Sequence, residues 1–344
     1  MRILLIFLTM HLMNFASGQT TKSPSVQLVE NPSNQNVEVY FDGSLFTAYI
    51  YPDNIMKPVL WPLVTSKGNE ITRQYPLKKV AGERTDHPHH IGLWFNYGDV
   101  NGIDYWNNSD AIPADRKDKY GQIHHRKVVS TNVKKNQGEL VVEAQWVGKG
   151  QPTLDETTHY TFINKGDVRI IDRKTTLTAL VDASLEDNKE GVLGWRVAPE
   201  LELPSDDEIT LTDAHGNPTT VKATNDRATA DYLSSEGITG GDVWGTRARW
   251  MDLFGNFGND NVHVVIIDHP ENPGYPTYWH ARGYGLFAAN PLGQSALSDG
   301  KEALHFKLKK GESATFRYRI IVADGDKTGP KVWNKQADKF AKSK

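Results

Sequence analysis

Apolar and polar residues alternate with a period of two along most of this chain. Five segments show the alternation most clearly, and all are rich in β-branched and aromatic residues: 37–41, 140–146, 168–172, 262–267 and 314–320. A period of two places successive side chains on opposite faces of a strand. Turn formers such as Asp42-Gly43 separate the segments. Helical periodicity is scarce, with residues 332–342 as its best candidate, so the pattern predicts a mainly antiparallel β protein.

The same pattern, together with the first residues, predicts the domain organisation. Residues 3–15 are apolar, Arg2 precedes them, and residues 16–18 are small. We therefore expect a cleaved signal peptide over 1–18, which would make the protein exported, either periplasmic or secreted. No linker or fixed-period repeat divides the rest. The expected units are one large β-sandwich domain over 19–330 and a C-terminal helix or tail over 331–344.

Composition excludes several classes of function. The chain has 344 residues, no cysteine, and 39 basic against 42 acidic residues. Disulfides, thiolate catalysis and cysteine-bound zinc are therefore ruled out. Without a strong basic run, neither a nucleic acid nor a membrane is an expected partner, and nothing points to a protein partner. The serine-nucleophile, phosphate-loop and dinucleotide motifs are also missing.

Histidines and acids concentrate in residues 83–90, Glu-Arg-Thr-Asp-His-Pro-His-His. The unperturbed pKa of imidazole, about 6.5, suits proton transfer near neutral pH. An apolar segment with a tryptophan follows directly, which favours a loop or strand end that aims side chains into a pocket. The candidate catalytic residues of this segment are Glu83, Asp86, His87, His89 and His90.

Two further histidines, His124 and His125, follow at what we interpret as the start of a strand. Adjacent residues of a strand face opposite sides, so one of the two should reach a shared site, and the same argument separates His89 from His90. We expect His87, His89 and His124 to converge. A register shift of one residue would reverse each assignment.

Two later segments add polar and aromatic candidates. Residues 190–196 supply Glu190 and Arg196, either as a carboxylate and a guanidinium at the site or as a surface ion pair. Residues 268–293 supply His280 as another catalytic candidate, beside aromatic side chains of the kind on which sugar rings stack. The candidate substrate-binding residues are Trp94, Asn101, Trp106, Tyr278, Trp279, Arg282 and Asn290.

The leading hypothesis is an enzyme that acts on a sugar or glycan fragment by hydrolysis, elimination or epimerisation. One imidazole would be the general acid, a second imidazole or Glu83 the base, and Arg196 or Arg282 would stabilise negative charge. In a rival hypothesis, a non-catalytic glycan-binding protein uses Trp94, Trp106, Tyr278 and Trp279 as a stacking platform. The carbohydrate is the expected partner in both cases.

A metal-dependent sugar-active enzyme is the third hypothesis. In it, His87, His89 and one of His124 or His125 bind zinc, copper or iron, and a fourth position stays open for chemistry. No tight motif such as H-E-x-x-H occurs. The leading hypothesis therefore has no cofactor, and a divalent metal remains the alternative.

Long motifs give a family resemblance over about residues 40–322. The motifs are residues 83–94, 98–106, 243–248 and 276–291. They resemble those of exported proteins often labelled PmoA-like, a family of undefined function whose members occur in genomes rich in glycan-degrading genes. The resemblance implies a carbohydrate ligand. The label itself implies methane oxidation, but the methane mono-oxygenase subunit of that name is an integral membrane protein, so we do not expect a methane oxygenase.

A weaker resemblance concerns the fold alone. Length, strand content and histidine-rich segments resemble the galactose mutarotase-like supersandwich, a large antiparallel β-sandwich. In mutarotases a histidine protonates the ring oxygen while a glutamate takes the anomeric proton. Their motifs do not align with the strings above, so the resemblance implies a fold and no residue roles.

Overall fold

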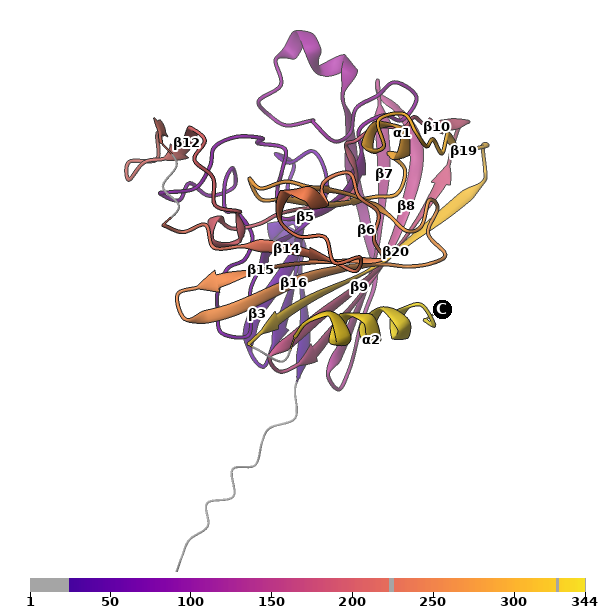
Figure 1. The fold of residues 1–344 in the computed structure, drawn as a ribbon. Coiled ribbons are helices and arrows are strands. Elements are labelled where there is room, and N and C mark those ends of the chain that lie inside the picture. Colours follow the sequence, from indigo (N-terminus) through magenta and orange to yellow (C-terminus); the bar gives the residue numbers. More distant parts are fainter. Residues whose placement is uncertain (1–24, 223–225, 326–327, 344) are drawn as a thin grey trace, which may run out of the picture.

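The computed structural model describes residues 25–222, 226–325 and 328–343, so the expected signal peptide lies outside the described residues. Two eight-stranded sheets face each other (Figure 1). In spatial order, the first sheet contains β1 (Val26–Asn31), β2 (Asn36–Phe41), β3 (Ser44–Ile50), β4 (Val59–Leu63), β5 (Leu93–Tyr97), β11 (Gly191–Arg196), β18 (Leu286–Asn290) and β17 (Tyr278–Ala281).

The second sheet is built from longer strands. In spatial order these are β14 (Asp231–Ser234), β15 (Trp250–Phe257), β16 (Asp260–Asp268), β20 (Ser313–Asp324), β9 (Val168–Ala179), β8 (Gln151–Lys165), β7 (Gln137–Gly148) and β6 (Gly121–Lys134). Neighbouring strands pair antiparallel in both sheets. The expected large antiparallel β-sandwich is therefore confirmed, and each of the five alternating segments lies in a strand.

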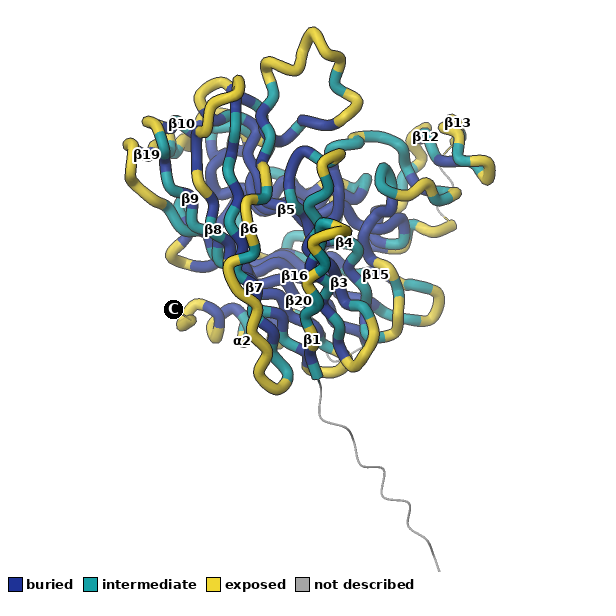
Figure 2. The backbone as a smooth tube through the Cα atoms, turned by 180° about the vertical axis from the view of Figure 1, so that it is seen from behind, coloured by how far each residue is buried: buried dark blue, intermediate teal, exposed yellow. Residues whose placement is uncertain are grey.

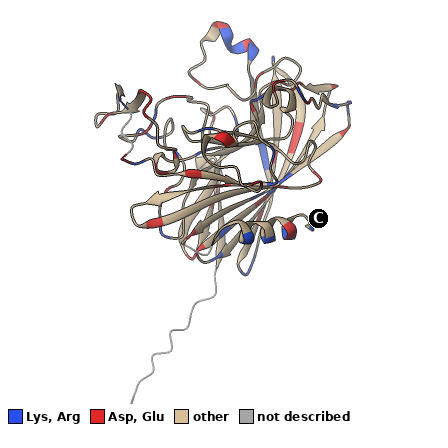
Figure 3. Cartoon of the chain, in the orientation of Figure 1, with Lys and Arg blue, Asp and Glu red and all other residues tan. Residues whose placement is uncertain are grey.

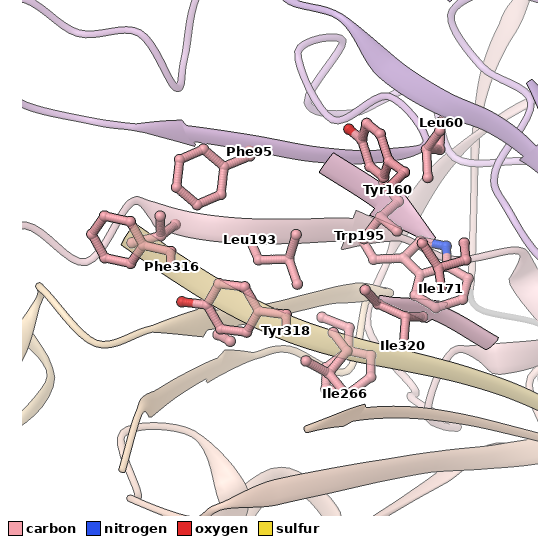
Figure 4. Packing of buried hydrophobic residues seen from close by; sticks show 14 of the residues in the cluster. Leu60, Phe95, Tyr160, Ile171, Leu193, Trp195, Ile266, Phe316, Tyr318 and Ile320 are labelled. Atoms are coloured by element: carbon pink, nitrogen blue, oxygen red, sulfur yellow. The ribbon is translucent and has the colours of Figure 1, made fainter. Parts of the chain in front are cut away.

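The main hydrophobic core lies between the sheets. Figure 4 shows Phe95 and Leu193 of the first sheet opposite Phe316, Tyr318 and Ile320 of β20. The rings of Phe95 and Phe316 are 5.6 Å apart between centroids. Figure 2 shows the buried residues in the centre of both sheets and the exposed ones along the peripheral loops. Burying this much apolar surface is the main force that holds the sheets together.

A helix covers part of the outer face of the second sheet. The expected helix at residues 332–342 runs as α2 from Pro330 to Phe340. Trp333, Ala337 and Phe340 pack on Val265 and Ile267 of β16, while the alternate residues of β16 point into the main core. The second sheet is therefore apolar on both faces at this position, which the spacing of two alone does not reveal.

The remaining elements are short. They are the strand pair β10 (Ala183–Leu185) and β19 (Phe306–Leu308), the strand pair β12 (Ile209–Thr212) and β13 (Pro218–Val221), the helix α1 (Gln294–Leu297), and the 3-10 helices η1 (Pro32–Asn34), η2 (Ala114–Lys119), η3 (Pro199–Leu201) and η4 (Gly240–Val243). The polar segment 107–119 is a loop that ends in η2. Acidic and basic residues are interspersed over the molecule (Figure 3). Within the described ranges, no helix combines the length and the apolar character needed to span a membrane.

Candidate functional site

The first sheet has a second face that points away from the main core and carries a smaller apolar cluster. On β5, Leu93, Phe95 and Tyr97 enter the core, so the alternate residues Trp94 and Asn96 lie on the opposite face. Strand pairing aligns four residues of this opposite face across four strands. They are Trp94 on β5, Gly194 on β11, Ala288 on β18 and His280 on β17.

Small residues in the middle of this row make room for the Trp94 ring. A Cβ atom on Gly194 would lie 2.4 Å from Cζ2 of Trp94 and 2.8 Å from Cη2 of Trp106, far closer than van der Waals contact allows. Both tryptophans are fully buried. The absence of a side chain at Gly194 is therefore what lets the indole of Trp94 lie flat on the sheet.

The histidine segment crosses this face as a turn. His90 N–H donates to the carbonyl of His87 at 2.9 Å, and His87 has a left-handed backbone with φ of 44°. The buried guanidinium of Arg73 holds the segment by donating to the carbonyls of Asp86, His87 and His90 at 2.7, 2.8 and 3.0 Å. These bonds help to maintain a conformation that is uncommon for a residue with a Cβ.

Asp86 joins the turn to the sheet. Its Oδ1 accepts from Arg73 at 2.8 Å and from Arg196 of β11 at 2.7 Å, and its Oδ2 lies 3.0 Å from Nδ1 of His87. Burial opposes ionisation of Asp86, but the hydrogen bond to His87 and the charges of Arg196 and Arg73 outweigh it. The pKa of this carboxyl is therefore held well below its usual range, and the ionised form orients His87 with Nδ1–H toward Asp86.

Four aromatic rings stack over the row. The ring of His87 lies parallel to the rings of Tyr284 and His90, with centroids 5.1 and 4.8 Å away. His90 in turn stacks on Trp94 at 5.2 Å. The side chain of His87 is 41% exposed, whereas His90 is buried. The stack therefore fixes the plane of His87 and leaves the ring open to solvent.

The neighbouring imidazoles are held neutral. Burial, and then the positive charge of Lys57, lowers the pKa of His89 to about 2, and burial also lowers the pKa of His90 far below its usual value. Nη1 of Arg196 lies 3.4 Å from Nδ1 of His90. A guanidinium can only donate, so Nδ1 accepts and the proton of His90 is on Nε2. That buried Nε2 has no partner within the described residues.

Glu190 and His280 lie at the opposite end of the row. Glu190 Oε2 is 3.7 Å from His280 Nδ1, and their side chains are 16% and 4% exposed. Burial raises the pKa of Glu190, although the charges of Lys189 and His87 partly offset the effect. Burial and the charge of Lys189 lower the pKa of His280 to about 3. The site thus combines an ionised Asp86, a carboxyl with raised proton affinity and a neutral imidazole.

Asn290 positions the loop that carries Glu190. Its Nδ2 donates to the carbonyls of Asn188 and Lys189 at 2.8 and 2.9 Å, and its Oδ1 accepts the backbone N–H groups of Leu292 and Gly293. The amide is occupied by these bonds. Asn290 therefore supports the site instead of binding substrate directly, which corrects its expected role.

The structure also corrects the role expected for Glu83. Its carboxylate is buried and accepts the backbone N–H groups of Gln74 and Tyr75 at 2.9 to 3.0 Å. A carboxylate that caps two backbone donors in this way supports the turn. It is not aimed at the imidazoles as a base.

His124 does not join the other histidines. It is exposed on β6, and His125 instead stacks on Tyr51, with centroids 3.8 Å apart, and bonds to the Tyr49 hydroxyl. The alternation argument also failed for His89 and His90, because residues 87–91 form a turn and not a strand. The imidazoles that the structure brings together are those of His87, His89 and His90, with His280 across the row.

The expected aromatic platform is not open to a ligand. Trp94, Trp106 and Trp279 are fully buried, and Tyr278 is 5% exposed. Trp279 faces the main core and stacks on Phe287. These rings support the fold and the histidine stack, so a platform of these four residues is a wrong prediction.

Two polar candidates lie away from or at the edge of the site. The side chain of Asn101 bonds the backbone of Asp182 and Ser184 in a distant turn, so its expected binding role is not supported. Arg282 is exposed, and its guanidinium lies 6.0 Å from the ring centroid of Tyr284. Arg282 therefore remains available to a ligand.

The expected metal ligands do not converge. No group of three or more histidine, aspartate or glutamate side chains in the described ranges has the arrangement needed to hold a metal ion. The proposed set of His87, His89 and His124 or His125 is split between the turn and β6. The third hypothesis therefore loses its ligand set.

Sequence reasoning missed three residues of the site: Arg73, Tyr284 and Lys57. Arg73 stands in an unremarkable stretch with no motif, and only its bonds to the turn reveal its role. Tyr284 lies inside one of the distinctive motifs but beside a glycine-rich turn. Lys57 is buried, and its Nζ donates to the carbonyl of His89 at 2.7 Å. The sequence does not reveal the roles of these residues, because the groups that each of them contacts lie far from it along the chain.

Residues 36–337 match the model of a family of unknown function, DUF6807. Among curated proteins, none is significantly similar. A galactose mutarotase-like protein from Clostridium acetobutylicum is 9% identical at a TM-score of 0.36, covering 88% of this chain and 99% of that one. The GH36 α-galactosidase AgaB from Geobacillus stearothermophilus is 12% identical at 0.40, covering 87% of this chain and 41% of that one. This chain therefore spans less than half of the galactosidase, and scores this low bear on neither substrate nor mechanism.

Proposed function

Because the chain belongs to the DUF6807 family, whose function is unknown, we propose a function from its own geometry: an exported acid–base enzyme acting on a sugar or glycan fragment. The single observation that carries the proposal is the Asp86–His87 pair, in which an ionised carboxylate orients an exposed imidazole at 3.0 Å. With Nδ1–H directed at Asp86, Nε2 of His87 is the nitrogen that can accept a proton. The PmoA-like label stays a prediction.

Glu190 is the complementary group in this proposal. Burial raises its pKa, so it holds a proton to higher pH than an exposed carboxyl does. An acceptor and a donor with opposite proton preferences are what acid–base catalysis requires. His87 would take a proton from the substrate while Glu190 delivers one to the departing or newly charged oxygen.

The carbohydrate part of the proposal depends on the polar groups around His87. A sugar presents hydroxyl groups that each need a donor or an acceptor. Exposed Arg282, half-buried Glu190 and exposed His87 offer both kinds of partner. The rival hypothesis of a pure glycan-binding protein has lost its aromatic platform, so no specific observation now favours it.

The test is turnover of a panel of oligosaccharides by untagged protein, with and without a chelator. We expect a chelator-independent activity that His87→Asn lowers by about 100-fold or more. His215→Asn, which changes an exposed turn residue, is the matched control and should leave activity unchanged. Turnover that survives His87→Asn would refute the role of the pair, and chelator-sensitive turnover with bound metal would favour the metal-dependent alternative.

A further inference from the structure

A pocket of about 280 Å³ opens beside the histidine turn. Its wall includes Pro88 and Ile91 of the turn, Leu77 on a neighbouring loop, and Asn108 and Ser109 of the long polar loop. Pro88 is the chain neighbour of His87, so the pocket and the proposed catalytic imidazole share the same turn, although His87 itself does not line the pocket. Nothing in the proton-transfer scheme above uses this space.

A buried cation lines the same pocket. Lys57 is 2% exposed, and its ammonium lies 5.3 Å from the ring centroid of Trp94. One of its three N–H donors is taken by the carbonyl of His89 at 2.7 Å. In the part of the chain that the structure describes, no ion pair joins Lys57 to a carboxylate. The charge of Asp104 acts on Lys57, but the oxygens of Asp104 accept the N–H groups of Trp106 and Asn107.

An ammonium group in this position lacks compensation. Removing a charge from water is costly unless an opposite charge or enough hydrogen bonds replace the solvent. Lys57 has one carbonyl and an aromatic face, which leaves two donors for a ligand. A negatively charged group in the pocket would supply the compensation that this amine lacks.

We propose that this pocket is an anion-binding subsite of the active site, in which Lys57 pairs with a carboxylate or sulfate group on the sugar. The inference rests on the proposed function and narrows its substrate class to acidic sugars. The bound anion would replace the missing counter-charge while the sugar ring extends past Pro88 toward His87. Among the residues that line the pocket, Asp110 is the one acidic residue, and it is exposed.

Protonation of Lys57 gives the subsite a characteristic pH dependence. Burial lowers the pKa of Lys57 to about 7, an effect that the charge of Asp104 partly opposes. The other ionisable residues around it are the neutral His89, whose carbonyl it binds, and Tyr75 and Asp110, which line the same pocket. An anion binds the ammonium form, so binding should take up a proton and weaken as the pH rises above about 7.

The experiment is calorimetric titration with three matched disaccharides, one carrying a uronate, one a sulfate ester and one neutral. Wild type should bind one of the two acidic sugars more tightly than the neutral one, and the preferred acid identifies the group. Lys57→Met should weaken that binding by about 10- to 100-fold, the value of a charge-assisted hydrogen bond, and change the affinity for the neutral sugar far less. Lys78→Met is the control, because it removes the same charge from an exposed position outside the pocket.

A second variant protects the test against misfolding. Ala111→Trp fills the pocket while retaining Lys57, and it should also remove the preference for the acidic sugar. Equal affinity of wild type for acidic and neutral sugars, or an unchanged preference in both variants, would overturn the inference. Turnover of a neutral sugar with His87 dependence would then leave the proposed function standing. Tight acidic-sugar binding that depends on Lys57, without any turnover, would support the subsite and refute the enzyme.

Discussion

The imidazole of His87 lies parallel to that of His90, with an interplanar angle of 1° and 4.8 Å between ring centroids. Two positive charges at this distance would repel each other by about 3 kcal/mol at an effective dielectric constant of about 20. Burial already holds His90 neutral. The neutral ring of His90 therefore places no second positive charge beside His87, and His87 is the ring of the pair that a substrate can reach.

Replacing Asp86 with asparagine tests the orientation of His87. The amide cannot stabilise an imidazolium and can present its NH₂ group to Nδ1, which favours the wrong tautomer. We expect Asp86→Asn to lower kcat/KM by about 100-fold or more and to shift the pH–rate profile. Circular dichroism checks that the fold persists, because Arg73 and Arg196 lose a charged partner. An unchanged pH–rate profile would mean that Asp86 only supports the turn.

Gly194→Ala tests whether the small residue beneath Trp94 determines the positions of the stacked rings. The new Cβ would lie 2.4 Å from Trp94, so the indole must shift and carry His90 with it. We expect activity to fall by at least about tenfold. Gly241→Ala is the matched control, since nothing lies within 4 Å of its Cβ and its φ is not positive. Equal kinetics for the two variants would contradict a role of Gly194 in positioning the stacked rings.

The sequence predicted the sandwich because a period of two is a direct consequence of strand geometry. The same reasoning failed where the backbone leaves the strand. His89 and His90 were assigned to opposite sides, yet the turn brings both rings to within 4.3 Å between centroids. Arg73 shows the other limit, because its bonds to residues 84–90 form only after the chain has folded. The local pattern of residues thus predicts which face of a strand a side chain occupies. The site itself is formed by contacts between residues that are distant in sequence.

Stability should fall in mild acid because of His280. Its pKa is about 3 in the folded protein and about 6.5 in an unfolded chain. Between these values the unfolded state binds more protons, so stability is complete above about pH 7 and is lost as the pH falls below about 6.5. At pH 5 this group alone costs about 2 kcal/mol. We expect Tm of wild type to drop from pH 7 to pH 5.

Substitution separates this effect from the other titrating groups. His280→Gln should reduce the slope of Tm against pH between 5 and 7 by the share of one histidine, because the glutamine takes up no proton. The rest of the slope should remain, since burial also lowers the pKa values of His89, His90 and His125. His215→Gln, at an exposed position, should retain the slope of the wild type. Identical slopes for all three proteins would show that His280 is not held neutral in the folded state.

The attachment of α2 gives a prediction about the fold itself. Trp333 Nε1 donates to buried Asp252 Oδ2 at 2.7 Å, and Asp252 also pairs with Nδ1 of His263 at 2.9 Å. Trp333→Phe removes one donor from a buried carboxylate. We expect a loss of about 1–3 kcal/mol in the free energy of unfolding, measured with urea. Val332→Ala, at an exposed position of the same helix, should cost far less.

On β5, β11 and β18, neighbouring residues point to opposite faces of the sheet. Selection for ligand recognition and selection for stable folding therefore act on different residues. Phe287 contributes to the main core, while the next residue, Ala288, belongs to the row beneath the histidines. A change that alters ligand choice at Ala288 need not disturb the packing that Phe287 maintains. Mutations that retune recognition and mutations that threaten folding therefore fall on alternate residues of one strand, which lets the chemistry of this face evolve while the scaffold stays the same.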